Sequence, residues 1–225
     1  MAVNVTELQK RIHAIVAQDA DGPTEGGDDW DLYLKYINMA QQEWQEAYQW
    51  PSLYKEVNTL TSQATGNVTV SLPADFRKFD ASPIICDGTN TKHTYPQVSP
   101  EMRGQYNDTE QYFYVLGYPG SYNMVVNPGT HGSGASIYYS YWSTAASLVS
   151  GDNVSMCPDP NYLSQRTVAY VWEARDDGRF PQAKAEADKI LARMLEFEQT
   201  KGYSYDDRIQ TYEEARYGFR IGKDS

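Results

Sequence analysis

The chain has 225 residues, 40% of them hydrophobic, and a formal net charge of −11. This length allows a buried core without disulfides or metal ions, and it predicts one ordinary domain, or one domain with an excursion. No run of about 18 apolar residues occurs, and residues 1–7 lack the basic and apolar regions of a signal peptide, so we expect neither a membrane span nor a secretory leader.

The charge and the tyrosine content indicate which kinds of binding partner the protein can have. Tight binding of nucleic acid usually requires a basic patch, and the sequence has no cluster of Lys or Arg. The acidity favours either plain solubility or a surface past which DNA moves without sticking, because like charges repel. The 19 tyrosines favour protein interfaces or a ligand-binding face. Cys86 and Cys157 are far apart and predict reduced thiols, unless folding brings them together.

Two helices are predicted before residue 50. The first covers about residues 6–18, and Asn4 with Glu7 forms a capping box at its start. The second covers about residues 29–49 and carries an aromatic and aliphatic stripe at helical spacing. The acidic, glycine-rich residues 19–29 lie between them. Asp19 and Asp21 have the spacing that begins a calcium loop, but the later ligands are out of register, which favours a solvated loop.

Two proline segments mark the ends of elements. Pro51 is expected to end the helix before it at Trp50, and Pro73 to end a strand at Leu72, because proline removes a backbone donor and restricts the preceding residue. Between them, residues 55–63 and 67–72 are predicted to pair as a compact β-hairpin. Trp50 and Phe76 are predicted to be packing residues.

Further strands follow in the middle of the chain. Residues 79–86 and 92–96 predict a second hairpin, and Ser99 with Pro100 predicts the start of a short helix. Three more strands are predicted at 111–116, 122–126 and 135–142. The last of these has aromatic residues on both faces, which indicates either burial on both sides or a contact surface.

The C-terminal part is predicted to be helical and then extended. Asp159 and Pro160 begin one helix that ends at Gly178, Pro181 begins the next, and the short connection predicts an antiparallel pair that ends at Gly202. Residues 203–225 predict an arm that docks on a neighbouring molecule, with a frayed terminus as the alternative. The candidate contact residues of the arm are aromatic or basic: Tyr203, Tyr205, Arg208, Tyr212, Arg216, Tyr217, Phe219 and Arg220.

No pattern indicates catalysis or metal binding. His13, His93 and His131 lack the spacing of a zinc site, and no nucleophile elbow or phosphate loop occurs. The glycine-rich residues 129–134 lie between strands, where they predict a hairpin tip. We therefore expect no enzyme, no metal and no cofactor.

These elements predict an α+β fold. N-terminal helices and a C-terminal antiparallel helix pair pack with an antiparallel β-sheet and hairpin region, followed by an extended C-terminal arm. The predicted organisation is a single domain over residues 1–202, with a helical layer at 5–50 and 160–201 and a β region at 55–142, and the arm at 203–225.

The order of several short motifs resembles the head-to-tail adaptor (connector) proteins of short-tailed bacteriophages. The motifs are Tyr36-Ile37-Asn38, Trp50-Pro51-x-Leu53, Leu72-Pro73-Ala74-Asp75-Phe76, Ser99-Pro100-Glu101, Tyr138-Tyr139 and Pro160-Asn161-Tyr162-Leu163. The long acidic loop after the first helix and the aromatic tail depart from the family's usual pattern.

The resemblance implies a structural virion protein at the head–tail junction, made in the host cytoplasm. Such a protein forms a ring, usually of twelve copies, below the portal protein and above a tail or nozzle protein. DNA passes through the ring without specific binding. The alternative is a carbohydrate- or ligand-binding module that uses the aromatic strand 135–142.

Overall fold

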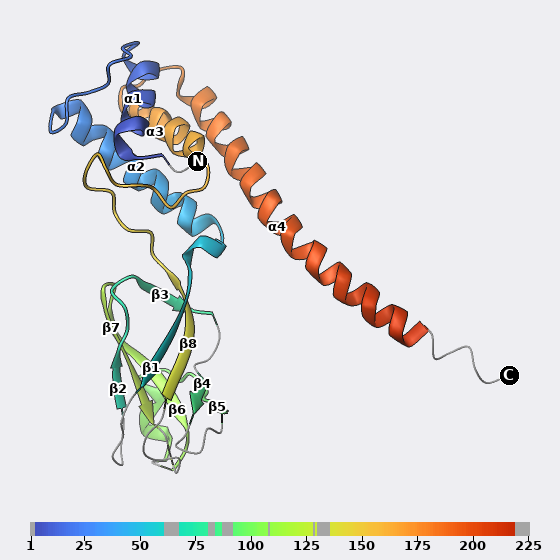
Figure 1. The fold of residues 1–225 in the computed structure, drawn as a ribbon. Coiled ribbons are helices and arrows are strands. Elements are labelled where there is room, and N and C mark those ends of the chain that lie inside the picture. The colour runs from blue at the N-terminus through green and yellow to red at the C-terminus, as the bar shows by residue number, and fades with distance from the viewer. Residues whose placement is uncertain are drawn as a thin grey trace. The chain divides into compact units, whose positions relative to one another are not determined.

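The structure is a computed structural model that describes residues 3–60, 68–80, 84–86, 92–107, 109–127, 129 and 136–218, without the side chains of 58–60, 84–86, 92–93, 136 and 201–218. The chain divides into two compact units (Figure 1). The helical unit contains residues 1–48 and 147–225, and the β unit contains residues 49–146. The predicted α+β class is confirmed, and the single domain over residues 1–202 stays a prediction.

The helical unit is built around one central helix. Its helices are α1 (Val5–Val16), α2 (Asp28–Ala47), α3 (Pro160–Ala174) and α4 (Phe180–Gly218). α3 packs against each of the other three, and the chain reverses between α3 and α4 (Figure 1). The caps follow the sequence: the Asn4 side chain accepts a hydrogen bond from the Glu7 amide at 2.9 Å, and Asp159 caps α3.

The C-terminal helix is longer than predicted. α4 passes through Gly202 and ends at Gly218, so the expected end at Gly202 is wrong and the backbone of residues 203–218 is helical rather than extended. A glycine inside a helix costs only about 1 kcal/mol relative to alanine, and good helix formers such as Glu213, Glu214 and Ala215 follow it. α3 also ends before Gly178, because Asp176 already adopts a left-handed conformation with φ of 53°.

The β unit contains two antiparallel sheets. In the five-stranded sheet the order is β1-β8-β4-β5, and β3 also pairs with β8; in the three-stranded sheet the order is β2-β7-β6. Two 3-10 helices, η1 (Pro51–Leu53) and η2 (Met102–Gln105), complete the unit. The strands are β1 (Tyr54–Leu60), β2 (Val68–Ser71), β3 (Phe76–Phe79), β4 (Ile84–Cys86), β5 (Lys92–Thr94), β6 (Tyr112–Tyr118), β7 (Ser121–Asn127) and β8 (Ser136–Ser143).

The strand pairing corrects one prediction and confirms others. The hairpin predicted from residues 55–63 and 67–72 is wrong, because β1 pairs with β8 and β2 pairs with β7, in different sheets. β1 pairs with β8 along its whole length, from Tyr54 opposite Trp142 to Leu60 opposite Ser136, and the shorter β2 cannot offer as many cross-strand pairs. The second predicted hairpin forms between β4 and β5, but its first strand begins at Ile84 and not at residue 79, where β3 ends. The strands predicted at 111–116 and 122–126 form as β6 and β7, and both proline segments follow the ends of elements, α2 and β2.

The short helix predicted at Ser99 also forms, as η2. The Met102 amide donates to the Ser99 carbonyl at 2.9 Å, so the chain turns here before the 3-10 helix begins at Met102.

Tyrosine supplies much of the core. Tyr95, Tyr139 and Tyr141 are buried in the main cluster of the β unit, and Tyr33 and Tyr162 are buried in the helical unit. The predicted packing residues Trp50 and Phe76 are buried as well, at 1% and 6% exposure. Part of the unusual tyrosine content is therefore explained by the interior, where the Tyr33 hydroxyl lies 3.3 Å from His13 and the Tyr141 hydroxyl donates to Asp75.

Candidate functional site

The described residues offer little for catalysis. No group of three or more His, Cys, Asp or Glu side chains among them could hold a metal ion, and no helix there is long and apolar enough to cross a membrane. His13 lies 3.3 Å from the Tyr33 hydroxyl and 3.8 Å from Asp19, in a structural role. The side chain of His93 and all of His131 lie outside the described residues.

Cys157 and the acidic loop do not form a reactive centre in the described part of the chain, and the side chain of Cys86 lies outside the described residues. Cys157 is buried without a disulfide, and burial raises the pKa of its thiol to about 12, so the thiol stays protonated at neutral pH. In the acidic loop, Asp19 accepts from the Asp21 amide, and Glu25 accepts from the Gly151 amide at 3.4 Å. Asp19 therefore binds the backbone of the loop itself, and Glu25 ties the loop to the backbone at Gly151.

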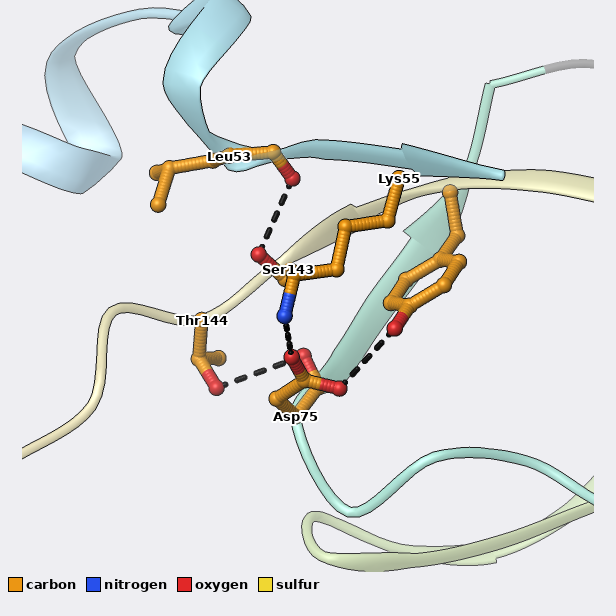
Figure 2. Close-up of polar contacts among 6 residues, drawn as sticks. Leu53, Lys55, Asp75, Ser143 and Thr144 are labelled. Carbon is orange, nitrogen blue, oxygen red and sulfur yellow. Dashed lines mark hydrogen bonds and ion pairs between the residues drawn. The ribbon is translucent and has the colours of Figure 1, made fainter. Parts of the chain in front are cut away.

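A polar cluster around Asp75 joins the two proline motifs of the β unit. Figure 2 shows Lys55 reaching the Asp75 carboxylate, while the Ser143 hydroxyl donates to the Leu53 carbonyl at 2.9 Å. The Tyr141 hydroxyl donates to the Asp75 carboxylate at 3.0 Å. The Thr144 amide donates to the Asp75 carbonyl at 2.7 Å. The end of β8 thus binds the segment that follows each proline.

The charge state of this cluster is set by its neighbours. Partial burial by itself would raise the pKa of Asp75, but hydrogen bonds from Lys55 and Tyr141 and the Lys55 charge outweigh it and leave that pKa below its ordinary value. Burial, together with the hydrogen bond to Asp75, raises the pKa of the Tyr141 hydroxyl. Asp75 is therefore ionised and Tyr141 neutral at neutral pH.

A second cluster joins three helices. Arg166 of α3 donates to both carboxylate oxygens of Glu43 of α2, with Nε–Oε2 and Nη2–Oε1 distances of 2.5 and 2.8 Å, and lies 3.8 Å from Asp188 of α4. The Arg166 guanidinium also covers the Tyr170 ring at 5.0 Å, and Tyr36 stacks on Tyr170 at 5.6 Å. This cluster fixes the relative orientation of α2 and α3 within the helical unit.

The motif Tyr36-Ile37-Asn38 has one structural role per residue. Tyr36 belongs to the cluster just described, and Ile37 is fully buried. The Asn38 amide group forms two hydrogen bonds with the backbone of Leu148, at 2.9 and 2.8 Å, which fixes the chain as it returns from the β unit to the helical unit.

The aromatic strand 135–142 is mainly a core strand. β8 lies inside the five-stranded sheet, and Ile137, Tyr139 and Tyr141 are buried. Tyr138 remains 39% exposed on the outer face, and Trp142 meets the exposed Tyr54 edge-on at 5.3 Å. Only the aromatic side chains on the outer face of the described strand are therefore accessible to a carbohydrate ligand.

The predicted contact residues of the arm do not gather in a described site. Tyr203, Tyr205, Arg208, Tyr212, Arg216 and Tyr217 lie in α4, where only the backbone is described, and Phe219 and Arg220 lie outside the described residues. The preceding part of α4 carries apolar side chains that remain accessible. After Ala187 no residue up to Thr200 is buried, and Phe197 is 61% exposed.

Two features of the structure could not be predicted from local sequence patterns. The ion pair of Glu43 and Arg166 joins residues far apart in the chain, and no local spacing signals it. A cavity of about 290 Å³ borders β3. Its lining residues come from segments far apart in the chain, around residues 76, 97, 115 and 122, so no local pattern could have indicated it.

The comparison with known families covers almost the whole chain. A family model described as SU10 adaptor protein matches residues 3–211, a range that includes the β unit, α1 to α3 and most of α4. Among curated proteins no match to the chain is found.

Proposed function

Because the chain belongs to the SU10 adaptor protein family of phage adaptor proteins, we propose that it is the head-to-tail adaptor of its virion. The family is structural and virion-associated, and its members interact with other phage head and tail components. The finer proposal is a ring of twelve copies below the portal protein, with a tail or nozzle protein attached beneath and no catalysed reaction. The match over residues 3–211 carries this proposal.

The long C-terminal helix supports a role in assembly. Between Ala187 and Thr200 the apolar side chains of α4, such as Met194 and Phe197, are not buried within the chain. A helix with accessible apolar residues needs a partner to cover them. We assign this partner to the portal protein or a neighbouring copy, which is the role predicted for residues 203–225.

The charge supports a DNA channel. A net charge of −11 repels the phosphate backbone, so DNA can pass through a ring of such subunits without being held. Strong non-specific affinity for DNA would slow both packaging and ejection.

Native mass spectrometry of the purified chain mixed with rings of its portal protein tests the proposal. The expected product is the portal ring carrying twelve copies of this chain. A stable monomer that ignores the portal and binds a glycan array would instead support the ligand-binding alternative.

A further inference from the structure

The two sheets of the β unit form a sandwich, and each sheet turns one face away from the shared core. The main cluster contains Met124 and Val126 of the three-stranded sheet together with Ile137 and Tyr139 of the five-stranded sheet, so the two sheets pack face to face. Since the side chains of a strand alternate between its two faces, the residues between these core positions point away from the core. The β unit therefore has two outer faces, which lie on opposite sides of it.

The outer face of the three-stranded sheet is covered in part. Tyr112 and Tyr114 lie in a second buried cluster, and Arg103 covers the Tyr114 ring at 6.0 Å. Nearer the turn between β6 and β7, Leu116 and Tyr118 continue the same alternation and are exposed. We call this accessible end the hairpin face, and it consists of Leu116 and Tyr118 of β6 with Ser121 and Asn123 opposite them on β7.

The outer face of the five-stranded sheet also carries accessible aromatic side chains. Tyr54 and Tyr138 are exposed, and the half-buried Trp142 lies directly opposite Tyr54 and so shares its face. Two carboxylates beside these residues already have donors, because the Tyr54 hydroxyl donates to Glu56 at 3.3 Å and the Trp142 indole N–H donates to Asp80 at 3.2 Å. We call this surface the aromatic face, and it consists of Tyr54, Tyr138, Ser140 and Trp142.

The strands that carry most of these residues contain no charge. No Asp, Glu, Lys or Arg occurs in β2, β6, β7 or β8, although 22% of the residues of the whole chain are charged. Two copies that each have a net charge of −11 repel one another, and this repulsion is weakest where uncharged surfaces meet. Exposed aromatic and aliphatic side chains also gain free energy when a partner removes them from water. Both properties favour a second copy of this chain as the partner.

The position of the two faces fits a ring. Each copy in a closed ring has two neighbours, and it meets them through two different surfaces. We propose that in the ring the hairpin face of one copy packs on the aromatic face of the next, so that the β units stack side by side. This inference rests on the proposed ring and identifies a contact that holds its copies together.

Photo-crosslinking in the assembled ring tests this proposal. The full chain carries Tyr118→benzoylphenylalanine, is mixed with an unmodified, isotopically heavy copy and is assembled on portal rings. Mass spectrometry should find crosslinks from position 118 to residues 54–56 or 138–142 that join a light chain to a heavy one. Val149→benzoylphenylalanine is the matched control, since Val149 is also an exposed apolar residue but lies in the helical unit, and its yield at these strands should be lower.

Charged variants provide an independent readout. Tyr118→Glu and Tyr138→Glu each place a negative charge on one face, and either should raise the concentration for half-maximal ring assembly at least about tenfold, because the contact would bury an unpaired charge. Val149→Glu is the control and should assemble like the unmodified chain. All three positions are exposed, so the urea midpoints of the variants should stay close to that of the unmodified chain.

The outcomes separate this inference from the proposed function. Rings that form without these crosslinks between copies, or that form unchanged with either tyrosine variant, overturn the inference and leave the proposed function intact. Crosslinks from position 118 to the portal protein alone overturn it as well and assign the hairpin face to that partner. An unmodified chain that forms no ring on the portal contradicts the proposed function itself.

Discussion

Trp50 links a sequence motif to the core of the β unit. It directly precedes Pro51, the residue that begins η1, and its side chain is only 1% exposed. Ser143 binds the next turn of the chain through the Leu53 carbonyl. The proline motif therefore acts through packing, and not through an exposed site.

Replacing Trp50 by alanine tests this assignment. Trp50→Ala should lower the free energy of unfolding by about 3–5 kcal/mol, because the substitution leaves a large cavity in a buried position. Urea unfolding measures the change. Tyr118→Ala is the control, since Tyr118 is 69% exposed, and should change stability by less than about 0.5 kcal/mol. A Trp50→Ala protein of unchanged stability that only fails to assemble would show that Trp50 is an interface residue.

The ion pair of Glu43 and Arg166 is the main polar link between α2 and α3. Glu43→Gln should lower the free energy of unfolding by about 1–2 kcal/mol, because Arg166 keeps its charge at a largely buried position and the pair is still partly exposed. Glu46→Gln, an exposed position on the same helix, should cost less than about 0.5 kcal/mol. Equal losses of unfolding free energy in the two variants would show that the ion pair of Glu43 and Arg166 contributes little to stability.

The Asp75 cluster predicts how the stability of the folded protein changes at low pH. The pKa of Asp75 is lowered in the folded protein, so its contribution to stability is present above its unfolded value of about 3.9 and is lost as the pH falls through the folded value. Asp75→Asn should therefore cost about 1 kcal/mol at pH 7, and the difference from the unmodified chain should shrink as the pH falls from about 5 to about 2.

Urea unfolding at several pH values measures this difference. The control, Asp152→Asn at an exposed position, should stay within about 0.5 kcal/mol of the unmodified chain throughout. A difference for Asp75→Asn that is independent of pH would contradict the charge assignment.

At the scale of elements, local signals in the sequence were reliable and long-range pairing was not. The caps at Asn4 and Asp159 and the β6–β7 hairpin follow from residues close in the chain. The partner of β1 does not, because β8 lies far along the sequence and is chosen by a complete seven-residue register and a shared core. The end of α4 was misjudged because one glycine is a weak helix terminator.

The candidate site shows the same limit. The aromatic and basic character of residues 203–225 is visible in the sequence, but the cavity beside β3 is assembled from segments around residues 76, 97, 115 and 122. No local sequence pattern can predict that these four segments line one cavity, since this depends on how the two sheets pack.

The C-terminal part of α4 should be dispensable for folding and essential for assembly. A chain that ends at Thr200 keeps every described buried residue, so its free energy of unfolding should change by less than about 1 kcal/mol in urea. Particles that carry only this shortened chain should fail to join tails to filled heads. Particles that still join them would refute the role assigned to the arm.

At the scale of the whole molecule, the β unit is an insertion in the helical unit. The helical unit is formed from residues 1–48 and 147–225, and the β unit lies between them in sequence. Tyr54 of β1 pairs with Trp142 of β8, so the two ends of the insertion are held side by side by one strand pair. Asn38 then fixes the returning chain at Leu148. Such an arrangement suits a structural subunit that presents different surfaces to different partners.

The central claim is that this chain forms the adaptor ring between portal and tail. Electron microscopy of intact particles, with a label fused to this subunit, tests it most directly. The account predicts twelve labels in a ring at the head–tail junction, directly below the portal. Labels on the capsid surface or along the tail fibres, or particles without the label that are fully assembled, would contradict it.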